Sequence, residues 1–268
     1  MLTVENLRFS YVQGQDIMKD VTFTIGNGEF ITLGGRNGCG KTTVTRLLVG
    51  LETPVKGKIS YDGQDITYMP TSERGRFIGY VFQQPDRQMF RQTVAEEVAF
   101  GPEQLGYDKE TVQTIVKEAL ERVGISHLAE AYPLGLRRGE KQRVAIASAL
   151  AMQSKLLILD EPTSGQDGTE TKGLLALLRE LQDQGLTILL ITHDMEIMAE
   201  YSTRVIIMGY GTKAFDGSPE ELFTSRDDLL ELGLTKPPSV VLSETVPALG
   251  YCKSMKEFEL RYAEHVKG

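Results

Sequence analysis

The stretch Gly35-Arg-Asn-Gly-Cys-Gly-Lys-Thr-Thr43 decides the fold of this chain. It matches the phosphate-binding loop pattern G-x-x-x-x-G-K-[ST] at every fixed position. An apolar run typical of a strand, residues 30–33, precedes it, and a pattern typical of a helix, residues 41–49, follows it. Glycines let the backbone wrap an anion, so that successive N–H groups and the positive end of the helix dipole point at phosphates. The sequence therefore predicts a strand, a phosphate loop and a helix within an α/β nucleotide-binding fold.

Each side chain of this motif has an expected task. Lys41 would reach the β- and γ-phosphates of ATP, the Thr42 hydroxyl would ligate Mg²⁺, and Thr43 would bind the α-phosphate. The other loop residues expected around the phosphates are Asn37, Gly38, Cys39 and Gly40.

A second motif predicts the metal side of the same site. The apolar run of residues 156–159 suits a strand buried on both faces, and it ends in Asp160 and Glu161. Two adjacent carboxylates at the end of a buried strand are costly unless something uses them. We expect Asp160 to hold Mg²⁺, directly or through water. Glu161 is placed to polarise an attacking water as general base, a role that typically contributes ~10²–10⁴-fold in rate.

The composition agrees with a nucleotide enzyme. The chain has 268 residues and a formal net charge of −8, which argues against broad nucleic-acid binding. Two cysteines, Cys39 and Cys252, supply neither a disulfide framework nor a zinc set, as in a protein of a reducing compartment. No apolar run approaches the ~18 residues of a membrane span, and no signal-peptide pattern opens the chain. We expect a chain that does not cross a membrane by itself.

Strand and helix patterns alternate along most of the chain, which predicts a mainly parallel sheet with crossover helices. Residues 2–11 and 21–25 read as paired strands of a separate antiparallel part. A helix-rich stretch, about residues 85–151, interrupts the alternation as an insertion. We therefore expect one nucleotide-binding domain over residues 1–218 and a small extension over 219–268. The clearest helix patterns cover residues 108–124, 139–152, 170–184 and 254–267.

At this point the residues resemble one family. Over about residues 1–220 the chain resembles the ATP-binding cassette of ABC transporters, a family with a P-loop NTPase core. Tyr11 stands where the family places an aromatic that stacks on adenine. Gln83 matches the Q-loop glutamine, which touches Mg²⁺ or water and reports nucleotide occupancy to the membrane partner. Residues 164–167 resemble the D-loop, and His193 matches the switch histidine near the γ-phosphate.

One subfamily is the most similar. The stretches Val81-Phe-Gln-Gln-Pro-Asp-Arg-Gln88 and Thr93-Val-Ala-Glu-Glu-Val-Ala-Phe-Gly-Pro102 resemble the cassettes of energy-coupling factor importers. That resemblance implies an ATPase on the cytoplasmic face of the membrane, driving uptake of a vitamin or of cobalt or nickel. It also implies as partners a second cassette, a transmembrane coupling subunit and a separate substrate-capture subunit. The extension over residues 219–268 is a candidate dimerisation element.

We expect the coupling subunit to contact residues 85–100, where Met89 and Phe90 stand among polar neighbours. Exposed methionines and aromatics are typical interface anchors. The alternative is that both side chains pack inside the helical insertion.

The chain departs from the family at the signature, which reads Leu-Ser-Gly-Gly-Gln in typical members. Here the serine is Arg137, the first glycine is Arg138, Gly139 is kept, and the glutamine is Glu140. In the family, the serine and glycines bind the γ-phosphate of ATP held by the opposite subunit. The arginines could pair with that phosphate, or they could obstruct the close approach that glycine permits. We expect this chain to work best beside a different cassette with an ordinary signature, rather than as a homodimer.

Two other functions share the nucleotide motifs. The chain could serve an ABC transporter of another class, such as an exporter. It could also be a regulatory cassette that binds ATP without transport, although the presence of Glu161 and His193 argues against a binding-only role.

Overall fold

Six strands form the sheet that carries the phosphate loop. The structure is a computed structural model that describes residues 1–267. In spatial order the strands are β10, β9, β3, β8, β7 and β6, and all except β10 run parallel. Their bounds are β3 (Phe30–Gly35), β6 (Ile78–Val81), β7 (Leu156–Asp160), β8 (Thr187–Ile191), β9 (Arg204–Gly209) and β10 (Thr212–Gly217). Every residue of β3, β7 and β8 is buried, as expected for parallel strands covered on both faces.

A second, antiparallel sheet has the order β2-β1-β4-β5. Its strands are β1 (Leu2–Phe9), β2 (Met18–Ile25), β4 (Lys56–Tyr61) and β5 (Gln64–Asp65). Apolar side chains from this sheet, from β3 and from α1 (Lys41–Leu48) form one core. The two sheets therefore enclose the helix that follows the phosphate loop, and the predicted α/β class with an antiparallel part is confirmed.

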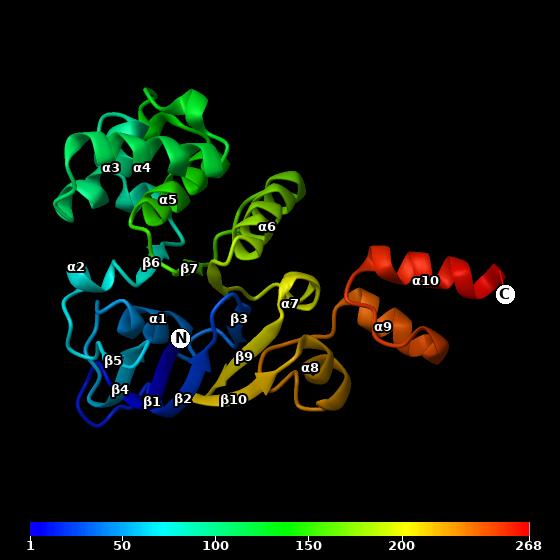
Figure 1. Ribbon diagram of the computed structural model, residues 1–268. Helices are drawn as coiled ribbons and strands as arrows, with labels where there is room; N and C mark the ends of the chain where they lie inside the picture. Colours follow the sequence, from blue (N-terminus) through cyan, green and yellow to red (C-terminus); the bar gives the residue numbers. More distant parts are fainter. Residues whose placement is uncertain (268) are drawn as a thin grey trace.

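A helical subdomain is inserted between β6 and β7, and it stands away from the sheets in Figure 1. Its elements are the 3-10 turn η1 (Pro85–Gln88), α3 (Val94–Gln104), α4 (Lys109–Arg122), η2 (Ser126–Leu128), η3 (Pro133–Gly135) and α5 (Arg138–Ala151). The Asp108 carboxylate caps α4 by accepting from the N–H groups of Glu110 and Thr111 at 3.1 and 3.0 Å. The helix patterns at 108–124 and 139–152 are thus both present as helices.

The remaining helices are α2 (Thr71–Arg74), α6 (Gly168–Asp183), α7 (Met195–Tyr201), α8 (Pro219–Ser225), α9 (Pro238–Thr245), η4 (Pro247–Leu249) and α10 (Met255–Lys267). Residues Leu222, Phe223 and Leu232 share a core with Val205 and Ile207 of β9, so the first part of the extension is continuous with the sheet. The helices α9 and α10 form an arm that leads away from it (Figure 1). No helix within residues 1–267 is both long enough and apolar enough to cross a membrane.

Arg74 joins the far end of α1 to the antiparallel sheet. Its side chain is only 2% exposed. Nη1 donates to the carbonyls of Leu47 and Leu48 at 2.6 and 2.9 Å, and Nη2 donates to the carbonyl of Thr67 at 2.6 Å. A cation is favourable at a helix C-terminus, where carbonyls lack partners within the helix. Arg74 therefore fixes α1 at the end opposite the phosphate loop.

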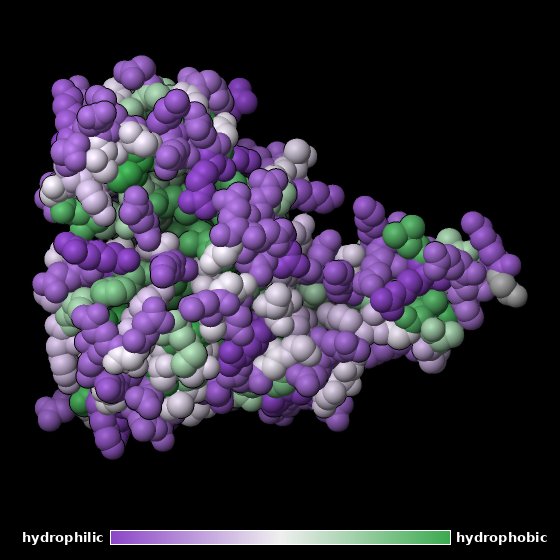
Figure 2. All heavy atoms as spheres, viewed as in Figure 1, coloured by the Kyte–Doolittle hydropathy of each residue, from purple (hydrophilic) through white to green (hydrophobic). Residues whose placement is uncertain are grey.

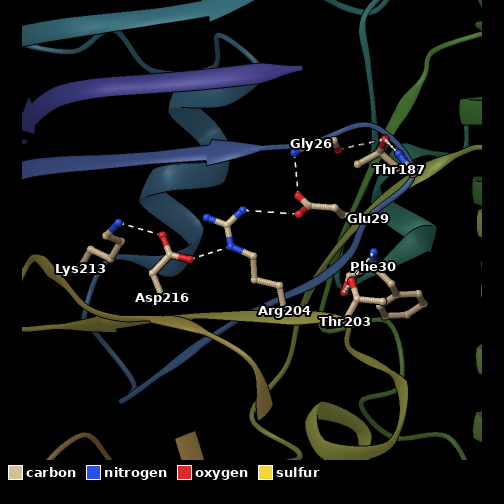
Figure 3. Close-up of polar contacts among 9 residues, drawn as sticks. Gly26, Glu29, Phe30, Thr187, Thr203, Arg204, Lys213 and Asp216 are labelled. Atoms are coloured by element: carbon tan, nitrogen blue, oxygen red, sulfur yellow. Dashed lines mark hydrogen bonds and ion pairs between the residues drawn. The ribbon is translucent and has the colours of Figure 1, made fainter. Parts of the chain in front are cut away.

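A polar cluster ties the antiparallel edge of the large sheet to the turn before β3 (Figure 3). Arg204 donates to Asp216 at 2.7 Å and lies 3.5 Å from Glu29, and Lys213 donates to Asp216 at 2.8 Å. Burial alone would raise the pKa of Asp216, but the hydrogen bonds from Arg204 and Lys213 outweigh it and lower that pKa. Glu29 also accepts from the N–H of Gly26 at 2.6 Å. The cluster thus holds β9, β10 and the β2–β3 turn in register.

Candidate functional site

The phosphate loop joins β3 to α1 through three glycines with positive φ, at residues 35, 38 and 40. Gly35 is required here, because a Cβ on it would lie 2.2 Å from the carbonyl oxygen of Met208. Lys41 arches back over the loop, and its Nζ donates to the carbonyls of Gly35 and Arg36 at 2.7 and 3.2 Å. No side chain caps α1, so its first N–H groups point into the loop. Backbone donors and one ammonium therefore converge on this concavity, as an anion site requires.

The other predicted loop residues differ in exposure. Asn37, Gly38 and Thr42 are exposed, whereas Cys39 and Thr43 are buried. Burial raises the pKa of the Cys39 thiol. Cys39 is thus a packing residue that stays protonated at neutral pH.

Tyr11 lies on a short hairpin beside the phosphate loop. The hairpin is closed by the hydrogen bond from the N–H of Ile17 to the carbonyl of Phe9 at 2.9 Å. Ile17 also lies against Gly40, because a Cβ on that glycine would be 3.8 Å from its Cγ2. The Tyr11 ring packs edge-on against Phe9 and is otherwise exposed. The ring is placed near the loop, and its stacking on adenine stays a prediction.

The carboxyl ends of neighbouring parallel strands bring the remaining residues together. Asp160 ends β7 and Glu161 follows it, Gln83 comes two residues after β6, and His193 comes two residues after β8. These strands are adjacent in the order β8-β7-β6, with β3 and its loop on the other side of β8. Ligands of open α/β sheets bind at this edge.

Glu161 is the centre of the group. Its Oε2 accepts from Gln83 Nε2 at 3.0 Å, and its Oε1 lies 3.5 Å from His193 Nδ1. Its own N–H donates to the carbonyl of Ile191 at 2.9 Å, and its φ is +45°, in the left-handed region that non-glycine residues rarely adopt. Such strain persists where the surroundings over-determine it, often at functional sites. The three residues predicted from separate motifs are therefore joined through one carboxylate.

Asp160 lies beneath this group and is only 8% exposed. Burial raises the pKa of Asp160, and the hydrogen bond that its Oδ2 accepts from the Tyr80 hydroxyl at 3.1 Å opposes that rise. The nearby Glu161 charge raises the pKa further, whereas a hydrogen bond from Thr42 lowers it. Burial also raises the pKa of Tyr80, so Tyr80 is a neutral donor throughout the physiological range.

The donor set fits Mg²⁺, which prefers oxygen ligands and retains several waters. The predicted ligands Thr42 and Asp160 supply a hydroxyl oxygen and a carboxylate oxygen. Gln83, the third predicted ligand, is held at Glu161. When bound, Mg²⁺ would neutralise charge on the phosphate oxygens.

The signature residues lie at the start of α5 and outside this group. Arg137 and Arg138 are exposed, and Gly139 and Glu140 are half-buried. Glu140 Oε2 accepts from the N–H of Arg137 at 2.9 Å, so the acidic residue caps its own helix. These four residues therefore form a surface separate from the chain's own phosphate loop.

The expectation for Met89 was wrong. Met89 is 6% exposed and belongs to the core of the helical subdomain, whereas Phe90 is 61% exposed. The two neighbours point to opposite sides because Met89 follows the 3-10 turn η1 in an extended conformation. Only Phe90 is available to a partner.

Three contacts were missed by the sequence reasoning. Tyr80 carries no functional motif in the sequence, although a hydroxyl in a buried strand needs a partner. Lys141 Nζ pairs with Asp86 Oδ1 at 2.6 Å and joins α5 to the segment after Gln83. Gly233 packs on Arg36 of the phosphate loop, since a Cβ there would lie 3.1 Å from Arg36 Cα. No local pattern signalled the last two contacts.

Comparison with known proteins agrees with this geometry. The family model described as "ABC transporter" matches residues 18–164, more than half of the chain. The chain belongs to the ABC transporter family. The resemblance seen in the sequence is thereby confirmed, and the chain is one of the family's ATP-binding cassettes.

Two relatives and one solved structure show which members of the family this chain is similar to. An ABC transporter ATP-binding protein of Methanosarcina acetivorans is 40% identical over 92% of this chain, but the chain spans only 40% of that relative's length. The energy-coupling factor transporter ATP-binding protein EcfA of Methanosphaera stadtmanae is 38% identical over 88% of this chain and 86% of its own. The structure of cbiO1 from Clostridium perfringens, part of the ABC transporter complex cbiONQ, is 34% identical with a TM-score of 0.79, covering 93% of this chain and 96% of that chain.

We predict that Tyr80→Phe moves the acidic limb of the pH–rate profile to higher pH. The hydroxyl favours the ionised form of Asp160, so removing it raises a carboxyl pKa that burial already raises. Asp160 must be ionised to hold Mg²⁺, so turnover should be lost at a higher pH than in the parent. The measurement is kcat/KM for Mg·ATP from pH 5 to 8. Tyr61→Phe, another buried tyrosine, should leave the profile in place. An unshifted acidic limb in Tyr80→Phe would contradict the assignment.

Proposed function

We propose that this chain is the ATP-hydrolysing subunit of an ABC importer of the energy-coupling factor type, driving uptake of a vitamin or a metal ion. The observation that carries the proposal is the position of Glu161 between Gln83 and His193. A general base needs hydrogen-bonding partners that orient it, and here both come from neighbouring strands. Family membership supports the ATPase activity, and the EcfA relative supports the subfamily.

The chain's own residues divide the work of hydrolysis. Backbone N–H groups of the loop and Lys41 bind the phosphates and position them in line with the acidic pair. Thr42 and Asp160 hold the metal. Glu161 accepts a proton from the attacking water, and His193 braces the γ-phosphate from the next strand. Gln83 donates to Glu161, so movement of the segment after β6 would change the orientation of the base.

The hydrogen bond from Gln83 to Glu161 suggests how a membrane subunit senses the nucleotide bound to this chain. Gln83 is followed by η1, whose Asp86 pairs with Lys141 at the start of α5. Glu161, Gln83 and the signature helix are therefore connected through one short segment. A membrane subunit that moves this segment would act on the base and on the signature together.

The surface for that subunit is the helical subdomain around Phe90. The Phe90 ring packs edge-on against Phe100 at 4.9 Å, and the Arg91 guanidinium lies over both rings. An apolar groove of about 730 Å³ lies between α3 and α4. Apolar residues that line it are Ala95, Ala99, Val112, Val116 and Leu120. An exposed aromatic and an apolar groove on the same helical subdomain suit a helix of the transmembrane coupling subunit.

A second cassette completes the assembly. This chain supplies an intact phosphate loop, acidic pair and switch histidine but an altered signature, so a different cassette with an ordinary signature is the better partner. The arm formed by α9 and α10 is a candidate for the contact between the two cassettes. Its exposed apolar side chains are Val241, Leu242, Leu260, Tyr262 and Val266. Figure 2 shows hydrophobic patches on the surface of this arm. A separate membrane protein would capture the substrate, and this chain would work at the cytoplasmic face of the membrane.

We expect Glu161→Gln to bind Mg·ATP with unchanged affinity but to lower turnover by ~10²–10⁴-fold, the usual contribution of a general base. The new carbonyl can still accept from Gln83, so the geometry survives while basicity is lost. Nucleotide affinity and phosphate release would be measured in the reconstituted complex. Glu180→Gln, an exposed carboxylate on α6, is the matched control. Parental turnover in Glu161→Gln would remove Glu161 from the chemistry.

Phe90→Ser should weaken association with the membrane subunits several-fold, because it removes the exposed aromatic anchor while leaving the buried Met89 in place. Nucleotide affinity should not change, since Phe90 lies outside the loop. Tyr68→Ser is the control, because Tyr68 is also an exposed aromatic but lies in the turn after β5, outside the helical subdomain. The readout is recovery of the polytopic partner on affinity-tagged chain. Equal recovery from both variants would exclude this surface.

A further inference from the structure

Arg138 contacts its own chain, although the family uses this position to face the opposite subunit. Its guanidinium covers Gly165 of the D-loop: a Cβ on that glycine would lie 2.7 Å from Nη1 and 3.1 Å from Cζ. Gly165 has a φ of +72°, a left-handed conformation that also disfavours side chains. The arginine that replaces a glycine in the signature therefore lies on a glycine that the D-loop requires.

Hydrogen bonds connect the D-loop, residues 164–167, to Glu161, the proposed general base. The N–H of Ser164 donates to the carbonyl of Glu161 at 3.1 Å, and the N–H of Gln166 donates to the carbonyl of Thr163 at 3.1 Å. Asp167 then caps α6 by accepting from the N–H groups of Thr169 and Glu170, both at 2.8 Å. A contact that fixes Gly165 thus restrains a turn that begins at Glu161.

Two neighbours of Arg138 on α5 also contact other parts of the chain. Gly139 lies against the first turn of α6, since a Cβ on it would be 3.3 Å from Glu170 Oε1. Arg143, one turn further along α5, donates to the carbonyl of Val123 at 2.6 Å and so anchors the helix to the end of α4. The start of α5 is therefore held against both the D-loop and α6.

We propose that Arg138 is a positioning residue that clamps the D-loop of its own chain through Gly165 and thereby holds Glu161 in place. A planar guanidinium can lie over a peptide unit, whereas an ammonium cannot cover it in the same way. The loss of the signature glycine is then a change of function, from a contact across the dimer to a brace within one subunit. The predicted effect on kcat rests on the proposed ATPase function, whereas the contact between Arg138 and Gly165 does not.

The test is a double-mutant cycle on Arg138→Ala and Gly165→Ala in the full chain. In the parent, a Cβ at residue 165 must collide with the guanidinium or displace it, whereas with Ala at residue 138 only the backbone strain remains. Gly165→Ala should therefore lower kcat at least about twofold more in the parent than in the Arg138→Ala background, because contacting residues are non-additive. Arg138→Ala and Arg138→Lys should both lower kcat without changing the dissociation constant for ATP.

Hydrogen exchange in the isolated chain gives a second readout that needs no hydrolysis. The amides of Ser164 and Gln166 should exchange several-fold faster in Arg138→Ala and in Arg138→Lys than in the parent. If the parent proves inactive, the proposed function fails while exchange still tests the clamp. Additive effects on kcat in the double-mutant cycle, together with unchanged exchange of the Ser164 and Gln166 amides, would overturn the proposed clamp. So would parental kcat in Arg138→Lys, which indicates a charge acting on phosphate, or increased turnover in Arg138→Gly, which indicates obstruction.

Discussion

The parallel register of three strands is the constraint on which the site depends. β7 pairs with β8 so that Asp160 lies opposite Ile191, and β6 pairs with β7 so that Val81 lies opposite Leu159. Each strand therefore ends at the same edge, and the next residues of each chain segment converge there. The hydrogen bond from the Glu161 N–H to the Ile191 carbonyl continues the pairing by one step and turns the backbone into its left-handed conformation. A slip of one residue in any pairing would separate Gln83, Glu161 and His193.

Much of this arrangement could be predicted from the sequence because its determinants are local. The phosphate loop, the acidic pair after an apolar strand and the Asp108 cap of α4 each depend on residues within one short window. The convergence of Gln83, Glu161 and His193 follows from one further inference, that the strands preceding them are parallel neighbours. The structure brings these residues together as the motifs predicted, and their individual roles stay predictions.

The contacts that could not be predicted join distant segments or depend on a side chain's direction. Nothing in the sequence around Tyr80 identifies Asp160 as its partner, because that pairing depends on the register of β6 against β7. Met89 and Phe90 are adjacent and equally apolar in pattern, yet the backbone at the end of η1 buries one and exposes the other. Arg138 could have faced solvent, a partner's phosphate or its own D-loop, and only the packing of α5 on the turn after β7 decides among them.

The chain thus brings Gln83, Glu161 and His193 together at one edge of the sheet, while its signature residues lie on a separate surface. In a cassette dimer these two surfaces serve different nucleotides, so the two sites of an assembly containing this chain should be unequal. A preorganised donor lost from a charge-stabilising site costs ~10²–10³-fold in rate, which is enough to make one site dominant. The ATP on this chain's own loop would be hydrolysed opposite an ordinary signature, and the site facing Arg137 and Arg138 would be slow.

The inequality of the two sites is tested most directly by turnover per nucleotide site. Turnover is measured first on the purified chain alone. It is then measured on the chain together with the cassette that co-purifies with it from its native membrane complex. We predict slow hydrolysis by the chain alone and fast hydrolysis in the mixed assembly. The fast hydrolysis should be abolished by Glu161→Gln in this chain but not by the matching change in its partner. Full activity of the chain alone, or equal sensitivity to the change in either cassette, would contradict the inequality.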